Sequence, residues 1–400
     1  MTFLCITCYF KGEAFLRTLK ELGNTVYLLT RQDLKHESWP LDHIDEIFYM
    51  NSDANSPQNF SDLAKGFAWL AQTRKIDRIV ALDDYDVEKA AYLREEFRIP
   101  GMGQTTARYF RDKLAMRIRA KEAGINVPPF TALFYDQDIH AFTQQVPTPW
   151  ILKPRSEASA VGMRKLYSAE ELWSILHQIG AERHRFLLEQ FKAGDVYHAD
   201  SLTMDGRVGF VRSSKYLNTP FEVAHGGGIF RTHILEFGGE EDQALKLLNT
   251  KVLNAFGMRF SASHTEFIRA HEDGQFYFLE TSSRVGGAHI AEMVEYSAGI
   301  NLWSEWAKIE SAMARDETYH FPRLTYYYAG LMVSLARQQH PDTVSYQDTE
   351  IVWRLEKDFH VGFVLQSESR ERVLELLNSY LPRVYADFHT SAPPKTELTH

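Results

Sequence analysis

A pair of glutamates in the second half of the chain has the spacing of a carboxylate site. Two strand-like runs flank the turn at Asp273-Gly274, and a three-residue loop over 272–274, closed by a left-handed glycine, would place Glu266 directly opposite Glu280. A two-residue loop would send the two side chains to opposite faces, and one or both could then point to solvent. Facing carboxylates repel each other unless a cation lies between them, and oxygen-only ligands suit Mg²⁺. The three-residue loop therefore predicts a magnesium site.

The residues that follow Glu280 are suited to an anion. Arg284 offers a planar fork that matches a carboxylate or phosphate, and Gly286 and Gly287 allow backbone N–H groups to approach closely. Taken alone, such a segment is more often an ordinary loop. Its position directly after the predicted carboxylate pair favours an anion site.

Two lysines stand out by their context. Lys153 closes the apolar run 150–152 and precedes a proline, and Lys113 lies inside an otherwise helical pattern. Lysine is a compact charge that commonly meets phosphate, although exposed lysines are abundant. The small-residue stretch 156–162 has the character of a loop that folds over a phosphate tail, but it does not match the P-loop pattern.

The elements that must position these residues alternate between strands and helices over the first hundred residues. The alternation predicts a parallel α/β sheet, followed from residue 197 by a β-rich part with helices at 240–256 and 290–314. We predict an α/β protein with α+β lobes. Its expected divisions are an N-terminal α/β domain (1–104), two lobes (105–195 and 196–315), an α+β segment (316–390) and a disordered tail (391–400).

Composition and charge argue against several classes of protein. The 400 residues carry 53 acidic and 44 basic side chains, a formal charge of −9, which disfavours a nucleic-acid partner. No apolar run reaches the roughly 18–20 residues of a membrane span, and no signal-peptide pattern follows Met1. The chain has two cysteines, Cys5 and Cys8, and we expect both to be buried as small hydrophobic residues. We expect a cytoplasmic protein without a membrane partner.

Six segments in order resemble the ATP-grasp superfamily, most closely its carboxylate–amine ligases and biotin-carboxylase-like branch. The match covers residues 1 to about 310 and is weaker beyond. Its motifs are Ile99-Pro100-Gly101 with Arg111-Asp112-Lys113, Ile151-Leu152-Lys153-Pro154, 187–191, 194–200, 264–267, and Leu279-Glu280 with Arg284 and Gly286-Gly287. The resemblance implies the ATP-grasp fold: a pre-ATP-grasp domain (1–104), a nucleotide lobe (105–195) and a catalytic and metal lobe (196–315) that clamp ATP, and a C-terminal α+β segment.

The same resemblance implies a role for each candidate residue. The nucleotide contacts would be Lys113 and Lys153 with the phosphates, Glu189, Gln190 and Phe191 with adenine, Asp195 with the ribose hydroxyls, and His198 nearby. The ligands of one or two Mg²⁺ ions, with Mn²⁺ as an alternative, would be Glu266, Glu280 and the weaker Ser282, which stands where many members have Asn. The catalytic group would be Lys153, Arg284, Gly286 and Gly287, with Arg284 stabilising an acyl phosphate.

The reaction implied is the ATP-dependent joining of a small carboxylate to an amine, as of an amino acid, through an acyl phosphate and with release of ADP. Lys215, His225 and Arg231 are further candidates for a substrate anion, because 224–231 has the character of a mobile substrate loop, although a structural loop is commoner. Two alternatives stay open. One is a carboxylase or nucleotide-biosynthesis ligase of the same fold, and the other is an ATP-binding regulator without catalysis. The family also suggests a homodimer.

Overall fold

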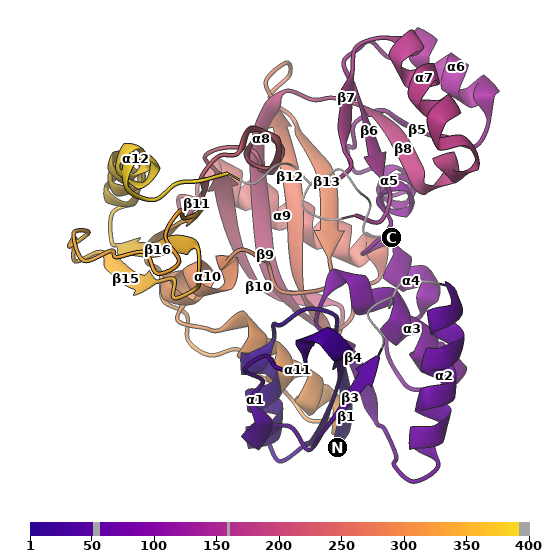
Figure 1. The fold of residues 1–400 in the computed structure, drawn as a ribbon, viewed down its shortest axis with the longest axis vertical. Helices are drawn as coiled ribbons and strands as arrows, with labels where there is room; N and C mark the ends of the chain where they lie inside the picture. The colour runs from indigo at the N-terminus through magenta and orange to yellow at the C-terminus, as the bar shows by residue number, and fades with distance from the viewer. Residues whose placement is uncertain (51–56, 158–160, 392–400) are drawn as a thin grey trace.

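The computed structural model describes residues 1–50, 57–157 and 161–391, and these residues form three β-sheets (Figure 1). Over these ranges, no helix is both long enough and apolar enough to cross a membrane. Most of the predicted tail, 392–400, and residues 158–160 of the small-residue stretch lie outside the described residues.

The N-terminal domain is a parallel sheet in the order β3-β2-β1-β4, which confirms the predicted parallel α/β arrangement. Cys5 and Cys8 are buried free thiols, as expected. The elements are β1 (Thr2–Thr7), α1 (Glu13–Glu21), β2 (Thr25–Arg31), β3 (Glu46–Met50), α2 (Pro57–Ala71), β4 (Arg78–Ala81) and α3 (Val87–Glu96), with short 3₁₀ turns at Gln32–Leu34, Leu41–His43 and Asp84–Asp86.

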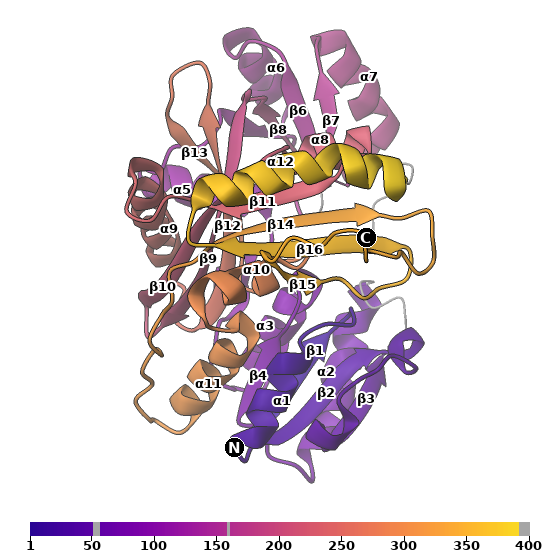
Figure 2. The same ribbon diagram turned by 90° about the vertical axis from the view of Figure 1, so that its left-hand side faces the viewer.

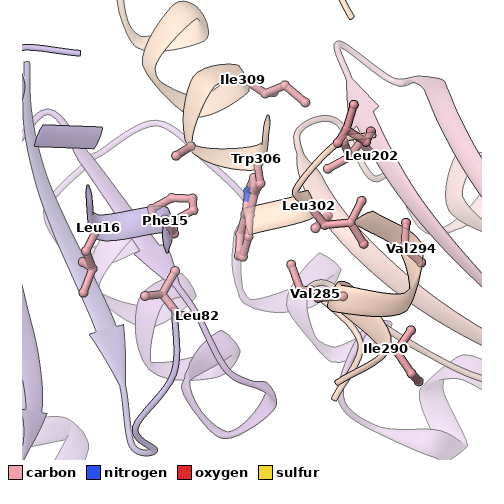
Figure 3. Close-up of a cluster of buried hydrophobic side chains, with 14 of the residues drawn as sticks. Phe15, Leu16, Leu82, Leu202, Val285, Ile290, Val294, Leu302, Trp306 and Ile309 are labelled. Carbon is pink, nitrogen blue, oxygen red and sulfur yellow. The ribbon is translucent and has the colours of Figure 1, made fainter. Parts of the chain in front are cut away.

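A helix from much later in the chain covers part of this domain. Helix α11 (Leu302–Ala314) packs against α1, and the rings of Trp306 and Phe15 meet with centroids 4.9 Å apart (Figure 3). The same buried cluster includes Leu202 of the largest sheet. The N-terminal domain and the largest sheet therefore share a hydrophobic core, which sets how they face each other.

The predicted single helix over 290–314 is wrong, because two helices occupy this range. Helix α10 (Ile290–Ala298) ends at Gly299, whose φ of 74° is a left-handed conformation that glycine adopts without strain. Asn301 then caps α11, and its side chain accepts hydrogen bonds from the backbone N–H groups of Trp303 and Ser304. The helix end at Gly299 and the new helix cap at Asn301 therefore outweigh the apolar pattern that continues through this range.

The second sheet belongs to a small lobe that stands apart from the N-terminal domain in Figure 1. Its strands pair antiparallel in the order β5-β8-β6-β7. Asp112 caps helix α5 (Lys113–Glu122), so Lys113 is the first residue of this helix and not the interior residue that the sequence pattern indicated. Helix α4 (Gln104–Arg108), which precedes the lobe, packs on α3 of the N-terminal domain. The elements that follow it are α5, β5 (Phe130–Ala132), α6 (Asp136–Gln145), β6 (Trp150–Pro154), β7 (Arg164–Leu166), α7 (Ala169–Ile179) and β8 (Phe186–Gln190), with a 3₁₀ turn at Gly180–Arg185.

The third sheet has eight strands in the order β13-β12-β9-β10-β11-β14-β16-β15. Its last three strands come from the region 316–390, which continues this sheet, and α12 (Arg370–Asp387) lies across β14 and β16 (Figure 2). The remaining elements are β9 (Gly194–Met204), β10 (Arg207–Tyr216), α8 (Pro220–Gly226), β11 (Phe230–Ile234), α9 (Glu240–Phe256), β12 (Ser261–Ala270), β13 (Phe276–Ser282), β14 (Tyr328–Leu335), β15 (Ile351–Arg354) and β16 (His360–Ser367).

Candidate active site

A cavity of about 570 Å³ lies where the three sheets approach one another. The N-terminal domain contributes Asp84, the small lobe contributes both candidate lysines, and the large sheet contributes the two glutamates. Residues named from the sequence that line it are Lys113, Lys153, Glu189, Gln190, Phe191, Glu266, Glu280, Ser282, Arg284 and Gly287. The structure therefore collects most of the predicted site residues in one place.

The two glutamates face each other across β12 and β13, which confirms their predicted pairing. The predicted loop is nevertheless wrong, because Ala270, and not His271, pairs with Gln275. This shifts the register by one residue, and a β-bulge next to Glu266 shifts it back. The correct pairing thus results from a longer loop and a bulge that compensate each other.

Glu280 already has a cationic neighbour. Its Oε2 lies 2.7 Å from the Nζ of Lys113, and that Nζ also donates a hydrogen bond of 2.6 Å to the carbonyl oxygen of Glu157. Burial disfavours ionisation of Glu280, but the charge of Lys113 outweighs burial and lowers the pKa of the carboxyl group. Glu280 is therefore a carboxylate at neutral pH, as a metal ligand must be.

Lys153 belongs to a buried charge network. Its Nζ forms an ion pair with Glu189, and the other carboxylate oxygen of Glu189 accepts a hydrogen bond of 2.9 Å from the Nε of Arg117. Burial lowers the pKa of Lys153 to about 8, although Glu189 acts in the opposite direction. Arg117 and Lys153 in turn outweigh the burial of Glu189 and lower its pKa. The Glu189 carboxylate thus holds Lys153 in place, and its adenine contact stays a prediction.

Arg284 is bound by a residue of the N-terminal domain. Its Nε and Nη2 donate to Oδ2 of Asp84 at 2.8 and 2.6 Å, although the two residues are 200 positions apart. Burial opposes ionisation of Asp84, but Arg284 and Arg111 outweigh it and lower the pKa of Asp84 to about 2. Asp84 was not among the site residues predicted from the sequence. The available signal was an acidic run directly after a strand of a parallel sheet, where functional side chains gather.

Gly286 packs directly on buried polar side chains. A Cβ atom at this position would lie 2.7 Å from Oδ1 of Asp200 and 3.0 Å from Nδ1 of His264. The glycine is thus required by close packing, in addition to any contact between its N–H and an anion. From the sequence, His264 and Asp200 were covered only by the motifs 264–267 and 194–200, without a role of their own.

We expect Gly286→Ala to destabilise the protein by about 1–3 kcal/mol, because the added methyl group overlaps the Asp200 and His264 side chains. Urea denaturation measures the change in the free energy of unfolding. Gly66→Ala is the control, since among the described residues no atom outside its own stretch of helix lies within 4 Å of its Cβ position, and we expect it to be neutral or stabilising. Equal stability of the two variants would contradict the packing argument.

Besides Gly286, four candidates are not among the described residues that line the cavity. Asp195 and Lys215 form a 2.8 Å ion pair with each other. His198 is fully buried and hydrogen-bonded to Asp200. The guanidinium group of Arg231 donates to Asn218 and to Leu377 and Asn378 of α12. The side chain of His225 lies outside the described part of the structure.

Solved structures with the same overall fold decide the classification. An L-amino acid ligase from Bacillus licheniformis superposes with a TM-score of 0.74 over 97% of this chain and 98% of its own, at 17% identity. The biotin carboxylase domain of a 2-oxoglutarate carboxylase from Hydrogenobacter thermophilus gives 0.71 over 94% and 88%, at 16% identity. The chain has the ATP-grasp fold. The ATP-grasp resemblance stated from the motifs is thereby confirmed.

Curated proteins with similar sequences are also named as ligases. The ATP-grasp chain is 29% identical over 256 residues to an L-arginine-specific L-amino acid ligase from Bacillus subtilis, which covers 62% of this chain and 59% of the relative. It is 22% identical over 188 residues to a D-alanine–D-alanine ligase from Neisseria meningitidis, covering 46% and 61%. The chain thus spans about three fifths of the length of these relatives. No protein-family model matches it.

Proposed function

We propose that this chain is an ATP-dependent ligase that joins the carboxylate of one small molecule to the amine of another, with an acyl phosphate as intermediate and ADP as product. One observation carries the proposal: the cavity sets the lysines of the small lobe against the glutamates and Arg284 of the large sheet. The names of the relatives support amino acids as substrates, since they are an L-amino acid ligase and a D-alanine–D-alanine ligase.

The donor set of the cavity fits Mg²⁺ with a nucleotide. Glu266 and Glu280 offer oxygen atoms only, in a facing pair, and Mg²⁺ is commonly held by one or two carboxylates together with phosphate oxygens. Ser282 also lines the cavity and stays a candidate for a weaker ligand. When bound, the ion would neutralise the negative charge of the phosphates. The biotin carboxylase neighbour was solved with MgADP, which supports a complex of Mg²⁺ and a nucleotide as the occupant of this cavity.

The residues of this chain would mainly supply position and charge. Lys153, fixed by Glu189, and Lys113 present two cations from one lobe, and Arg284 presents its guanidinium from the other side. The ion pair with Asp84 keeps that guanidinium oriented before substrate arrives. Such preorganised charge stabilises a phosphoryl-transfer transition state, and no nucleophilic side chain is required.

Affinity for ATP is expected to depend on the charge of Lys153. Because its pKa is about 8 in the free protein, the lysine is charged below that pH and neutral above it. Affinity should therefore be constant below about pH 7 and fall by up to about tenfold for each pH unit above 8. Titration calorimetry across this range measures the effect, and Lys153→Met should remove the dependence. The same pH dependence in both proteins would contradict the assignment.

The decisive experiment measures ADP and phosphate release with Mg-ATP and pooled amino acids and small carboxylates. Release that rises only with particular pools supports a ligase and begins to name its substrates. Binding of Mg-ATP without stimulated release from any pool would favour the regulator, and no nucleotide binding would refute the proposal.

We place the enzyme in the cytoplasm, which its two free cysteines support, and propose a homodimer, which the dimeric biotin carboxylase domain supports.

A further inference from the structure

We propose that a buried chain of hydrogen bonds, of which Tyr216 and His264 line the cavity, positions Glu266, and thereby the divalent cation that this carboxylate would hold. The inference rests on the proposed function, because it assigns Glu266 to the metal. It concerns residues that act through Glu266 and do not themselves meet the ion. We call them the positioning chain: Thr232, His198, Asp200, His264 and Tyr216.

The positioning chain runs across neighbouring strands of the large sheet. From β11, Thr232 Oγ1 lies 2.7 Å from Nε2 of His198, whose Nδ1 is 2.6 Å from Oδ2 of Asp200 on the same strand, β9. The other oxygen of Asp200, Oδ1, lies 2.8 Å from Nδ1 of His264 on β12. His264 Nε2 is 3.4 Å from Oε1 of Glu266. Every link up to the glutamate is buried.

Tyr216 provides a second and shorter contact to the same carboxylate. Its hydroxyl donates a hydrogen bond of 2.8 Å to Oε1 of Glu266 and lies 3.4 Å from Nε2 of His264. The tyrosine ring is 5% exposed and rests on His198, with ring centroids 4.6 Å apart. The ring is therefore fixed by packing, so its hydroxyl is held at one place.

Both contacts fall on one oxygen of Glu266. In the described part of the chain, Oε1 takes the bonds from Tyr216 and His264, and no hydrogen bond falls on Oε2. A carboxylate that is held through one oxygen can offer the other as a ligand with a fixed direction. Hydrogen bonds of this kind orient metal ligands and raise the affinity of a site for its ion.

The buried histidines and Asp200 are better explained by this role than by a metal site of their own. Their candidate ligand atoms lie within 4.8 Å of one another. Each oxygen of Asp200 is, however, already hydrogen-bonded to the Nδ1 of one imidazole, at 2.6 and 2.8 Å. Burying a polar group costs free energy unless the group is hydrogen-bonded. Here the hydrogen bonds connect these residues, one after another, to Glu266.

Tyr216→Phe tests the proposal with the smallest change, since it removes one hydroxyl and keeps the packed ring. We measure the affinity for ADP by titration calorimetry as a function of Mg²⁺ concentration, and again in EDTA. The Mg²⁺ concentration that gives half of the increase in ADP affinity should rise about 10- to 100-fold in this variant. Its affinity for ADP in EDTA should equal that of the wild type. Asp200→Asn should shift the Mg²⁺ requirement in the same direction.

Tyr197→Phe is the matched control. It also removes a phenol hydroxyl that donates to a carboxylate, the 2.6 Å bond to Glu241, but Tyr197 does not line the cavity. We expect it to keep the wild-type Mg²⁺ requirement. If Tyr216→Phe also keeps that requirement while the wild type responds to Mg²⁺, the positioning chain is refuted and the proposed function stands. If ADP binding to the wild type is independent of Mg²⁺, both are refuted.

Discussion

Glu280→Gln is expected to lower Mg²⁺-dependent turnover by at least about a hundredfold while the protein stays folded. The substitution keeps the size of the side chain and removes its charge. The carboxylate lies opposite Glu266 and 2.7 Å from Lys113, at the point where phosphate, metal and lysine would meet. An amide there is a weak ligand for Mg²⁺ and leaves Lys113 without a carboxylate partner, although its bond to the carbonyl oxygen of Glu157 remains. Steady-state ADP release at saturating Mg-ATP measures the loss.

The control for this experiment is Glu272→Gln, in the exposed loop between the same two strands. Glu272 pairs with Lys192 and does not line the cavity, so we expect nearly full activity. Circular dichroism and a urea titration establish whether both variants are folded. Turnover of Glu280→Gln at the wild-type rate would eliminate Glu280 as a metal ligand.

The second large effect is expected from Lys153→Met, which should weaken ATP binding about 10- to 100-fold. Methionine fills most of the same space but carries no charge, so the loss measures the cation. A charged hydrogen bond contributes about 1.5–3 kcal/mol, which corresponds to this change in affinity. Glu189 keeps its bond to Arg117 in the variant, which limits the cost of leaving that carboxylate buried. Titration calorimetry at about pH 7, below the pKa of Lys153, gives the affinity.

Lys65→Met, on the surface of α2, is the matched substitution. Lys65 is exposed, and within the described residues its ion pair is with Asp62 at 3.4 Å, a kind of surface pair that contributes little. We expect this variant to bind ATP like the wild type. Equal ATP affinity of Lys153→Met and Lys65→Met would remove Lys153 from the phosphate site.

Local patterns predicted much of the architecture and the centre of the site. Alternating strands and helices indicated the parallel N-terminal sheet, because each strand and helix has a period that can be seen in its own residues. Glu266 and Glu280 were paired because strand residues alternate between two faces, but the loop assumed between them was wrong, and a β-bulge restored the pairing. Lys153 stood out because a charged residue closes a buried strand. Each of these signals lies within a short stretch of chain.

Contacts between distant segments came only from the folded molecule. The bond between Arg284 and Asp84 joins positions 200 apart, and it exists because α11 packs on α1 and brings the N-terminal domain against the large sheet. The positioning chain crosses strands whose neighbours are set by sheet order, which no local period records. For the same reason Arg231, a candidate for substrate, lies against α12: residue type indicates which chemistry is available, and long-range packing decides where it is used.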